Sequence, residues 1–237
     1  MKIAKWLRPA ISVGIVIVVL VAAWGLLNLV IGGKCEGKCV TDTLAQMLRV
    51  ATPIAFAAFC GVLCERAGVV DIGIEGKMLM AAMVAYGVNL FSYQLLKNVM
   101  DPGIAGNVSR VLALVLSVGS AMLLALLHGV VSIRFKSDQI ISGTVINILA
   151  IGVTGFFYRQ FLAENLPAGP GTFPKLIIPL LADIPVLGPI LFRQQPLTYA
   201  MMILVFVLHY VLFYTPWGLR TRAVGEHPRA ADTLGIN

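Results

Sequence analysis

Charged residues are scarce in this chain. Only 12% of its 237 residues are Asp, Glu, Lys or Arg, whereas 59% are hydrophobic, and the mean hydropathy is +0.90. An ordinary soluble domain carries roughly 25% charged residues, so the composition excludes that class. Apolar runs of about 20 residues recur along the chain and predict an all-α, polytopic integral membrane protein.

Familiar signatures of catalysis and nucleotide hydrolysis are missing as well. The sequence has no GxxxxGK[ST] loop to hold phosphates, no HExxH and no GxSxG. We therefore expect neither an enzyme nor a cofactor site in this chain. If the protein moves a solute uphill, the energy has to come from an ion gradient or from a partner chain.

Acidic residues are fewer than basic ones, 11 against 18, which gives a net charge of +7. The basic residues are scattered along the chain rather than clustered, and this argues against a nucleic-acid partner. Basic loop ends beside membrane helices explain the excess better, so membrane lipid is the expected surrounding.

Cysteine is limited to two pairs, each spaced four residues apart. Cys35 and Cys39 share a loop and either form a small disulfide, if the loop is extracytoplasmic, or remain two free thiols. Cys60 and Cys64 share an apolar run, where buried packing is the simpler interpretation. Neither spacing matches a zinc pattern, and no histidine accompanies it.

Six apolar runs are long enough to span a bilayer, starting from a cytoplasmic N-terminus. The first follows three basic residues like a signal peptide, but it is longer than a signal core and lacks a small-x-small cleavage site. We therefore expect an uncleaved span. The six predicted spans are 11–30, 44–64, 78–96, 111–131, 140–157 and 197–213.

The connecting segments complete the predicted topology as one transmembrane domain over 1–237. A polar turn is expected at 97–110 and a short inside loop at 132–139. Proline interrupts 159–196 too often for a span, so we expect an ordered external loop there. The basic segment 215–237 returns to the cytoplasm and contains a short helix with Pro228 in its first position.

A polar stretch at 65–77, ERAGVVDIGIEGK, separates the second apolar run from the third. It holds five ionisable residues, each costing about 2.5–3.5 kcal/mol at mid-bilayer on insertion scales. Its three glycines suit a broken helix, which is tolerated at membrane depth only beside protein or a water-filled path. Two interpretations stay open: an interfacial loop, or a broken or re-entrant helix beside a solute path with Asp71 and Glu75 as candidate path residues.

Polar residues gather on one face of the fifth run. Thr144, Asn147, Thr154 and Tyr158 follow one another at spacings of three, seven and four residues. Such a face either makes interhelical hydrogen bonds, worth about 0.6–2 kcal/mol each, or lines the path of a polar solute. In the second case Thr144, Asn147 and Thr154 are candidate path residues.

Two histidines lie inside apolar runs, His128 in the fourth and His209 in the sixth. Each is either a satisfied interface histidine, which is the commoner case, or a proton carrier.

Four separated blocks resemble one protein family. ATPIAFAAFCGVLCERAGVVDIGIEGKMLM at 51–80 is similar to the stretch that begins permeases of bacterial simple-sugar and nucleoside ABC importers, whose usual form is close to SERAGVVNIGIEGMML. The likeness continues in the same order through three more blocks and covers nearly the whole chain. These are SDQIISGTVINILAIG at 137–152, DIPVLGPILF at 183–192 and TPWGLRTRAVGEHPRAADTLGIN at 215–237.

The resemblance implies an all-helical permease subunit of the branched-chain amino acid, ribose and nucleoside importer superfamily in a bacterial cell membrane. Such subunits pair around a central path, receive solute from an extracytoplasmic binding protein and are driven by cytoplasmic ATPase subunits, which use the ATP. The loop matching 218–236 holds the coupling helix that contacts the ATPase. Carried over by position, the coupling residues are Glu226, Arg229, Ala230, Ala231 and Gly235.

The sequence departs from the family form in two places. Position 71 is Asp where the family commonly has Asn, which adds a charge near Glu75. The chain ends just after the coupling segment, whereas family members continue through further spans, and this suggests a truncated or split product.

Two alternatives to a nucleoside or simple-sugar importer remain at this point. The first keeps the class and changes the solute to a branched-chain amino acid, because amide, hydroxyl and carboxylate groups bind any of these solutes. The second is an ion-coupled secondary transporter, with Asp71, Glu75, His128 and His209 carrying protons or cations.

Overall fold

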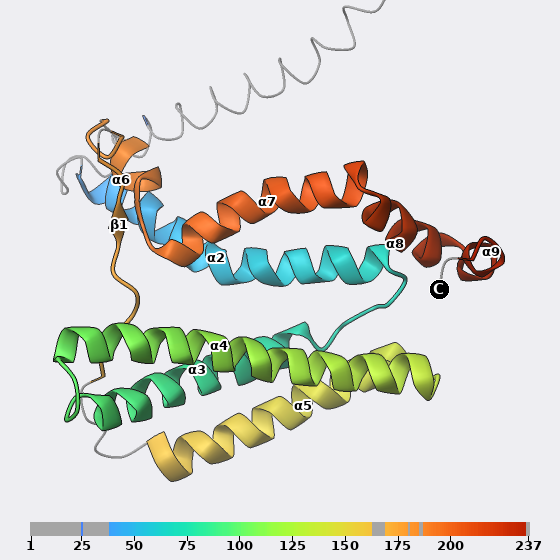
Figure 1. Ribbon diagram of the computed structural model, residues 1–237, viewed down its shortest axis with the longest axis horizontal. Helices are drawn as coiled ribbons and strands as arrows, with labels where there is room; N and C mark the ends of the chain where they lie inside the picture. The colour runs from blue at the N-terminus through green and yellow to red at the C-terminus, as the bar shows by residue number, and fades with distance from the viewer. Residues whose placement is uncertain (1–24, 26–37, 163–168, 180, 185–186, 236–237) are drawn as a thin grey trace, which may run out of the picture. The chain divides into compact units, whose positions relative to one another are not determined.

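The computed structural model describes residues 25, 38–162, 169–179, 181–184 and 187–235 (Figure 1). The predicted first span at 11–30 and the question of a Cys35–Cys39 disulfide therefore lie outside the described residues. The contacts divide the chain into two units. One consists of Met1–Ala51 and Lys175–Thr198, and the other of Thr52–Pro174 and Tyr199–Asn237.

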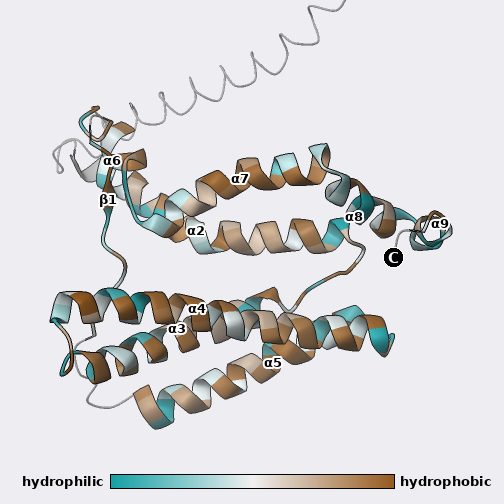
Figure 2. Ribbon diagram, viewed as in Figure 1, coloured by the Kyte–Doolittle hydropathy of each residue, from teal (hydrophilic) through white to brown (hydrophobic). Residues whose placement is uncertain are grey.

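Helices make up most of the described chain. Five of them are long and apolar enough to cross a membrane, and they confirm the five predicted spans that fall on described residues. Figure 2 shows that hydrophobic residues predominate along these helices. They are α2 (Lys38–Arg66), α3 (Ile74–Leu96), α4 (Pro102–Gly129), α5 (Gln139–Phe157) and α7 (Pro196–Tyr214). A π-helical turn extends α4 and another extends α5, namely η1 (Val130–Arg134) and η2 (Tyr158–Leu162).

Two predicted boundaries were wrong. The α4 helix begins at Pro102 rather than near 111, because proline fits the first helical position, where no backbone N–H is needed. The predicted polar turn at 97–110 is therefore confined to 97–101. The helices are also interrupted over fewer residues than the predicted 65–77, since α2 continues to Arg66 and α3 begins at Ile74. We call the seven residues between them, 67–73, the break.

The break begins with a glycine-dependent turn that ends α2. Gly68 has a positive φ of 78°, its N–H donates to Glu65 O at 3.1 Å, and the N–H of Val69 donates to Cys64 O at 3.0 Å. This pair of bonds is a Schellman motif, in which a left-handed residue turns the chain back along its own helix. The motif directs residues 69–71 back beside the last turns of α2.

Within the larger unit, α3 packs against α4 along most of its length and also against α5. The buried face of α4 carries small residues at a spacing of four, and such residues allow helix backbones to approach closely in a membrane. These residues are Ala105, Ser109, Ala113 and Ser117. Large apolar side chains such as Val115, Leu123 and Leu126 are exposed on the same helix and suit contact with lipid.

The smaller unit contains the described part of the predicted external loop. Strands β1 (Leu176–Ile177) and β2 (Arg193–Gln194) pair antiparallel, with α6 (Leu187–Leu191) between them in sequence. The buried Gln194 amide donates to Ala45 O at 3.3 Å and to Ile190 O at 2.5 Å. The external loop was predicted over 159–196, but the preceding spanning helix runs to Leu162 and the next one begins at Pro196; between them the described residues form no helix long enough to span.

Candidate functional site

An ion pair lies buried at the junction of the break with α3. The side chains of Asp71 and Lys77 are 4% and 8% exposed, and the Lys77 ammonium donates to Asp71 Oδ2. The other carboxylate oxygen, Oδ1, accepts the backbone N–H of Gly73 at 3.0 Å. The two charges neutralise each other, which offsets part of the cost of removing them from water.

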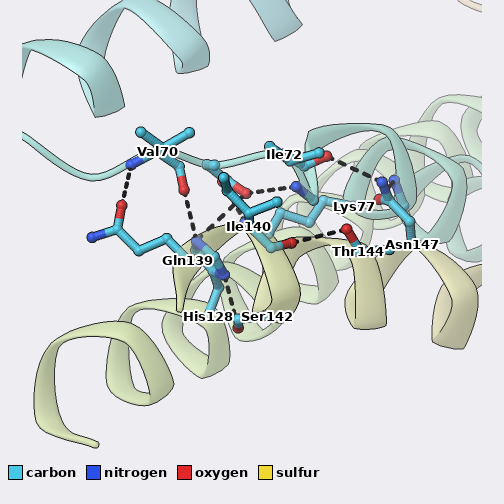
Figure 3. A network of polar contacts seen from close by, with 12 residues as sticks. Val70, Ile72, Lys77, His128, Gln139, Ile140, Ser142, Thr144 and Asn147 are labelled. Atoms are coloured by element: carbon cyan, nitrogen blue, oxygen red, sulfur yellow. Dashed lines mark hydrogen bonds and ion pairs between the residues drawn. The ribbon is translucent and has the colours of Figure 1, made fainter. Parts of the chain in front are cut away.

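His128 of α4 lies beside this ion pair. Figure 3 shows its ring between Val70 and Ser142, with Nδ1 3.1 Å from Ser142 Oγ and Nε2 3.3 Å from Val70 O. Nε2 is also 3.8 Å from Asp71 Oδ1. A neutral ring with its proton on Nε2 donates to Val70 O and accepts the Ser142 hydroxyl proton, which satisfies both nitrogens. These partners support the prediction of a satisfied interface histidine at this position.

Side chains of α5 bind the backbone of the break and of the first turn of α3. Gln139 Oε1 accepts the Val70 N–H at 2.7 Å. The Asn147 amide uses both of its groups: Oδ1 accepts the Gly76 N–H at 2.7 Å, and Nδ2 donates to Ile72 O at 3.1 Å (Figure 3). Because protein satisfies these backbone groups, the break meets the condition for irregular backbone at membrane depth. The geometry thus favours the broken helix over a free interfacial loop.

Close approach of α3 and α5 depends on glycines. A Cβ added at Gly76 would lie 2.7 Å from Asn147 Oδ1 and 2.8 Å from Asn147 Cα. A Cβ at Gly143 would lie 2.8 Å from the backbone nitrogen of Gly73. These distances leave no room for a side chain at either contact.

The five candidate path residues lie in three different surroundings. Asp71 and Asn147 both lie at the break, where each makes the hydrogen bonds described above. Glu75, in the first turn of α3, and Thr144 of α5 are both exposed. Thr154 is buried farther along α5, where its hydroxyl donates to Ala150 O at 2.7 Å, and the Thr144 hydroxyl donates to Ile140 O at 2.9 Å.

Sequence reasoning missed three residues of this network. Lys77 was noted only as one of the charges in the polar stretch, and Gln139 and Ser142 were not singled out. Gln139 and Ser142 bind partners about 70 and 14 residues away in sequence, so no local pattern indicates their role. Three glycines in the stretch were the one available signal that another backbone approaches closely.

The candidate coupling segment forms two short helices, α8 (Pro216–Glu226) and α9 (Pro228–Thr233). Thr215 caps α8 by accepting the Gly218 N–H at 3.2 Å, and Pro228 takes the first position of α9 as predicted. The coupling residues Glu226, Arg229 and Ala230 are exposed, whereas Ala231 is 2% exposed. Gly235 follows α9 with a positive φ of 74°, which favours glycine.

Backbone contact joins α8 to the break. A Cβ at Gly225 would lie 2.2 Å from Arg66 O and 3.0 Å from the Gly68 nitrogen. The end of α8 therefore lies directly against the turn that ends α2. This contact fits the predicted topology, in which an even number of spans separates each of the two segments from the cytoplasmic N-terminus.

Comparisons with known proteins agree over most of the chain. The family model described as "Branched-chain amino acid transport system / permease component" matches residues 43–237. The guanosine ABC transporter permease protein NupQ of Bacillus subtilis (strain 168) is 41% identical over 189 residues, which cover 79% of this chain and 56% of that protein. The nucleoside ABC transporter permease protein NupC of Lactococcus lactis subsp. cremoris (strain MG1363) is 37% identical over 195 residues, covering 82% and 59%.

The chain thus spans just over half the length of these relatives. No solved structure matches it.

Proposed function

This chain belongs to the family of branched-chain amino acid transport system permease components, and from that membership we propose that it serves as a membrane permease subunit of an ATP-binding cassette importer for nucleosides. The observation that carries the proposal is the match at 37–41% identity to two permeases named for guanosine and nucleoside transport. The location that follows is a bacterial inner membrane, with several spans.

The same comparisons favour this function over the two alternatives. A family of permease components argues against an ion-coupled secondary transporter, since its members work as parts of a larger transport system. The relatives' names favour nucleosides over branched-chain amino acids. A simple sugar, which the sequence also allowed, is the second candidate solute and ranks below nucleosides, because both relatives are named for guanosine or nucleoside transport.

The proposed partners supply what this chain lacks. A cytoplasmic ATPase subunit hydrolyses the ATP, a second permease subunit completes the path, and an extracytoplasmic binding protein delivers the solute. This chain itself needs no cofactor under the proposal. The long apolar helices with exposed apolar side chains face lipid or the second permease subunit.

We assign different tasks to the candidate path residues. Glu75 and Thr144 have exposed side chains and contact the solute: the carboxylate, and the oxygen of the hydroxyl that donates to Ile140 O, both accept hydrogen bonds from sugar hydroxyl and base amino groups. Asp71, Asn147 and Thr154 have engaged polar atoms and position the break and α5 instead. A solute site is specific when supporting contacts of this kind hold its polar side chains in a defined arrangement.

The contact between α8 and the break couples the movement of the ATPase to the solute path. The ATPase binds the end of α8 through Glu226 and binds α9 through Arg229 and Ala230, while Ala231 packs inward and Gly235 ends the segment. When the ATPase subunits move, α8 transmits the displacement through Gly225 to the turn at Gly68. The turn continues into the break, so the side chains beside the solute shift with it.

Uptake of labelled guanosine by cells with and without this gene tests the proposed solute. The gene is deleted in its own host and restored from a plasmid. Deletion should reduce uptake and restoration should recover it, and excess unlabelled adenosine should compete whereas leucine should not. Unchanged uptake after deletion, or competition by leucine alone, would contradict the proposed solute class.

A further inference from the structure

Two thiols near the end of α2 face the break. Cys60 and Cys64 lie one helical turn apart on the same face of α2, and both are free and partly buried. Their Sγ atoms and a carboxylate oxygen of Asp71 all lie within 4.8 Å of one another. The sequence indicated no metal site at this pair, because the third group comes from beyond the Schellman turn and is neither cysteine nor histidine.

We propose that Cys60, Cys64 and Asp71 bind a thiophilic divalent cation, Zn²⁺ or the softer Cd²⁺. A tetrahedral zinc ion has Zn–S bonds of about 2.3 Å and Zn–O bonds of about 2.0–2.2 Å, which places neighbouring ligand atoms roughly 3.5–3.8 Å apart. Atoms already within 4.8 Å reach that spacing by small side-chain rotations. Water takes the fourth position.

Charge balance favours binding at this partly buried place. Before binding, the cluster holds the Asp71 carboxylate, the Lys77 ammonium and two neutral thiols, and its net charge is zero. Binding replaces two thiol protons by one divalent cation, M²⁺ + 2 RSH → M(SR)₂ + 2 H⁺, so the net charge stays zero. Binding therefore adds no net charge to these low-dielectric surroundings.

Asp71 retains the capacity to coordinate a cation. A carboxylate offers about four acceptor positions, and the Gly73 N–H and the Lys77 ammonium use two of them. Two thiolates select a soft or borderline cation, whereas Mg²⁺ and Ca²⁺ require a shell of oxygen ligands. A bound cation would tie the last turn of α2 to the break, next to the contact with Gly225.

Titration of the purified full chain with Cd²⁺ tests the site. The variant Cys35→Ser/Cys39→Ser is the parent protein, so that only Cys60 and Cys64 remain as thiols. We expect one Cd²⁺ per chain, with an ultraviolet thiolate-to-cadmium absorption band and release of about two protons. Cys60→Ser and Cys64→Ser should each remove most of the band, and Asp71→Asn should weaken binding by about tenfold or more.

Matched variants separate loss of a ligand from loss of folding. Glu75→Gln removes a carboxylate outside the cluster and should bind Cd²⁺ like the parent. Asp71→Asn/Lys77→Met removes the ligand together with its paired charge, and it should still bind Cd²⁺ about tenfold or more weakly than the parent. Helix content by circular dichroism checks that each variant is folded.

Two results would overturn the proposal. The first is a folded parent protein without a one-to-one thiolate band. The second is Cd²⁺ affinity in the folded Asp71→Asn/Lys77→Met variant equal to that of the parent, because the thiols would then bind the metal without the carboxylate.

Discussion

At the scale of single residues, buried polar groups hold the break in place. Asp71 and Lys77 neutralise each other, His128 joins α4 to the break and to α5, and Asn147 holds two backbone groups at once. Each group has a partner because an unpaired polar group in this environment costs more than the bond itself gains. A substitution that removes one partner of a pair should therefore lower the stability of the protein more than a double substitution that removes both.

The Asp71–Lys77 pair provides the first prediction. Lys77→Met leaves a buried carboxylate without its cation, and breaking a buried pair in this way costs roughly 3–5 kcal/mol. Lys77→Met/Asp71→Asn removes both charges and should recover much of that stability. We expect a lower Tm for the single variant than for the double variant in detergent. Equal Tm values would contradict a stabilising role for the pair.

The contact between α3 and α5 provides the second prediction. Gly76→Ala places a methyl group 2.7 Å from Asn147 Oδ1 and 2.8 Å from its Cα, so the helices must separate. Gly87→Ala on the same helix meets nothing within 4 Å and should gain helix stability of up to about 1 kcal/mol. Thermal unfolding should therefore show a lower Tm for Gly76→Ala and an unchanged or higher Tm for Gly87→Ala. An equal change of Tm in both variants would mean that the close approach of α3 and α5 at Gly76 does not contribute to stability.

At the scale of helices, the sequence predicted the spans well and their ends poorly. Long apolar runs locate spans 2 to 6 because lipid requires about 20 apolar residues regardless of the rest of the fold. The ends depend on local backbone chemistry, such as Pro102 at the start of α4 and Gly68 in the turn after α2. Polarity alone placed both boundaries at the edges of the polar segments, at 64 and 111, whereas the structure sets them inside those segments, at Arg66 and Pro102.

The candidate site was predictable in part for a similar reason. Asp71 and Asn147 stood out because polar groups are costly in an apolar run. Their partners, including Gln139, Ser142 and the backbone of Ile72, are set by tertiary packing across α4 and α5. The proximity of Cys60 and Cys64 to Asp71 likewise depends on the turn that folds the chain back.

The contact between α8 and the break provides the third prediction. Gly225→Ala places a methyl group 2.2 Å from Arg66 O, although alanine alone would stabilise a helix by about 1 kcal/mol relative to glycine. A loss of uptake would therefore come from the lost contact. We expect reduced guanosine uptake at normal membrane levels, while Gly119→Ala, which meets nothing within 4 Å, should transport normally. Normal uptake by Gly225→Ala would argue against this route of coupling.

The exposed face of α5 provides the fourth prediction. Thr144→Cys in a cysteine-free background should react with a membrane-impermeant maleimide, and guanosine should slow the reaction. Leu149→Cys is the control, since Leu149 is exposed and apolar but lies about 140° around α5 from Thr144 and should face lipid. Equal labelling of both positions, unaffected by solute, would mean that this face of α5 does not line the path.

At the scale of the whole molecule, the chain spans just over half the length of the related permeases, and transport as proposed requires further subunits. The break, the turn at Gly68 and the coupling segment all lie in the larger unit, so the proposed route from ATPase to solute is continuous within it. The ATPase partner is therefore the central claim at this scale.

Co-purification from mild detergent tests this partner most directly. The full chain carries an affinity tag in its own host, and bound proteins are assayed for ATPase activity and identified by mass spectrometry. The parent chain and Arg220→Ala, which removes an exposed charge of α8 outside the coupling set, should both retain an ATPase subunit. Arg229→Ala/Gly235→Val should lose it, because the second change strains a position with φ of 74°. An ATPase absent from the parent, or retained undiminished by the double variant, would contradict the proposed coupling segment.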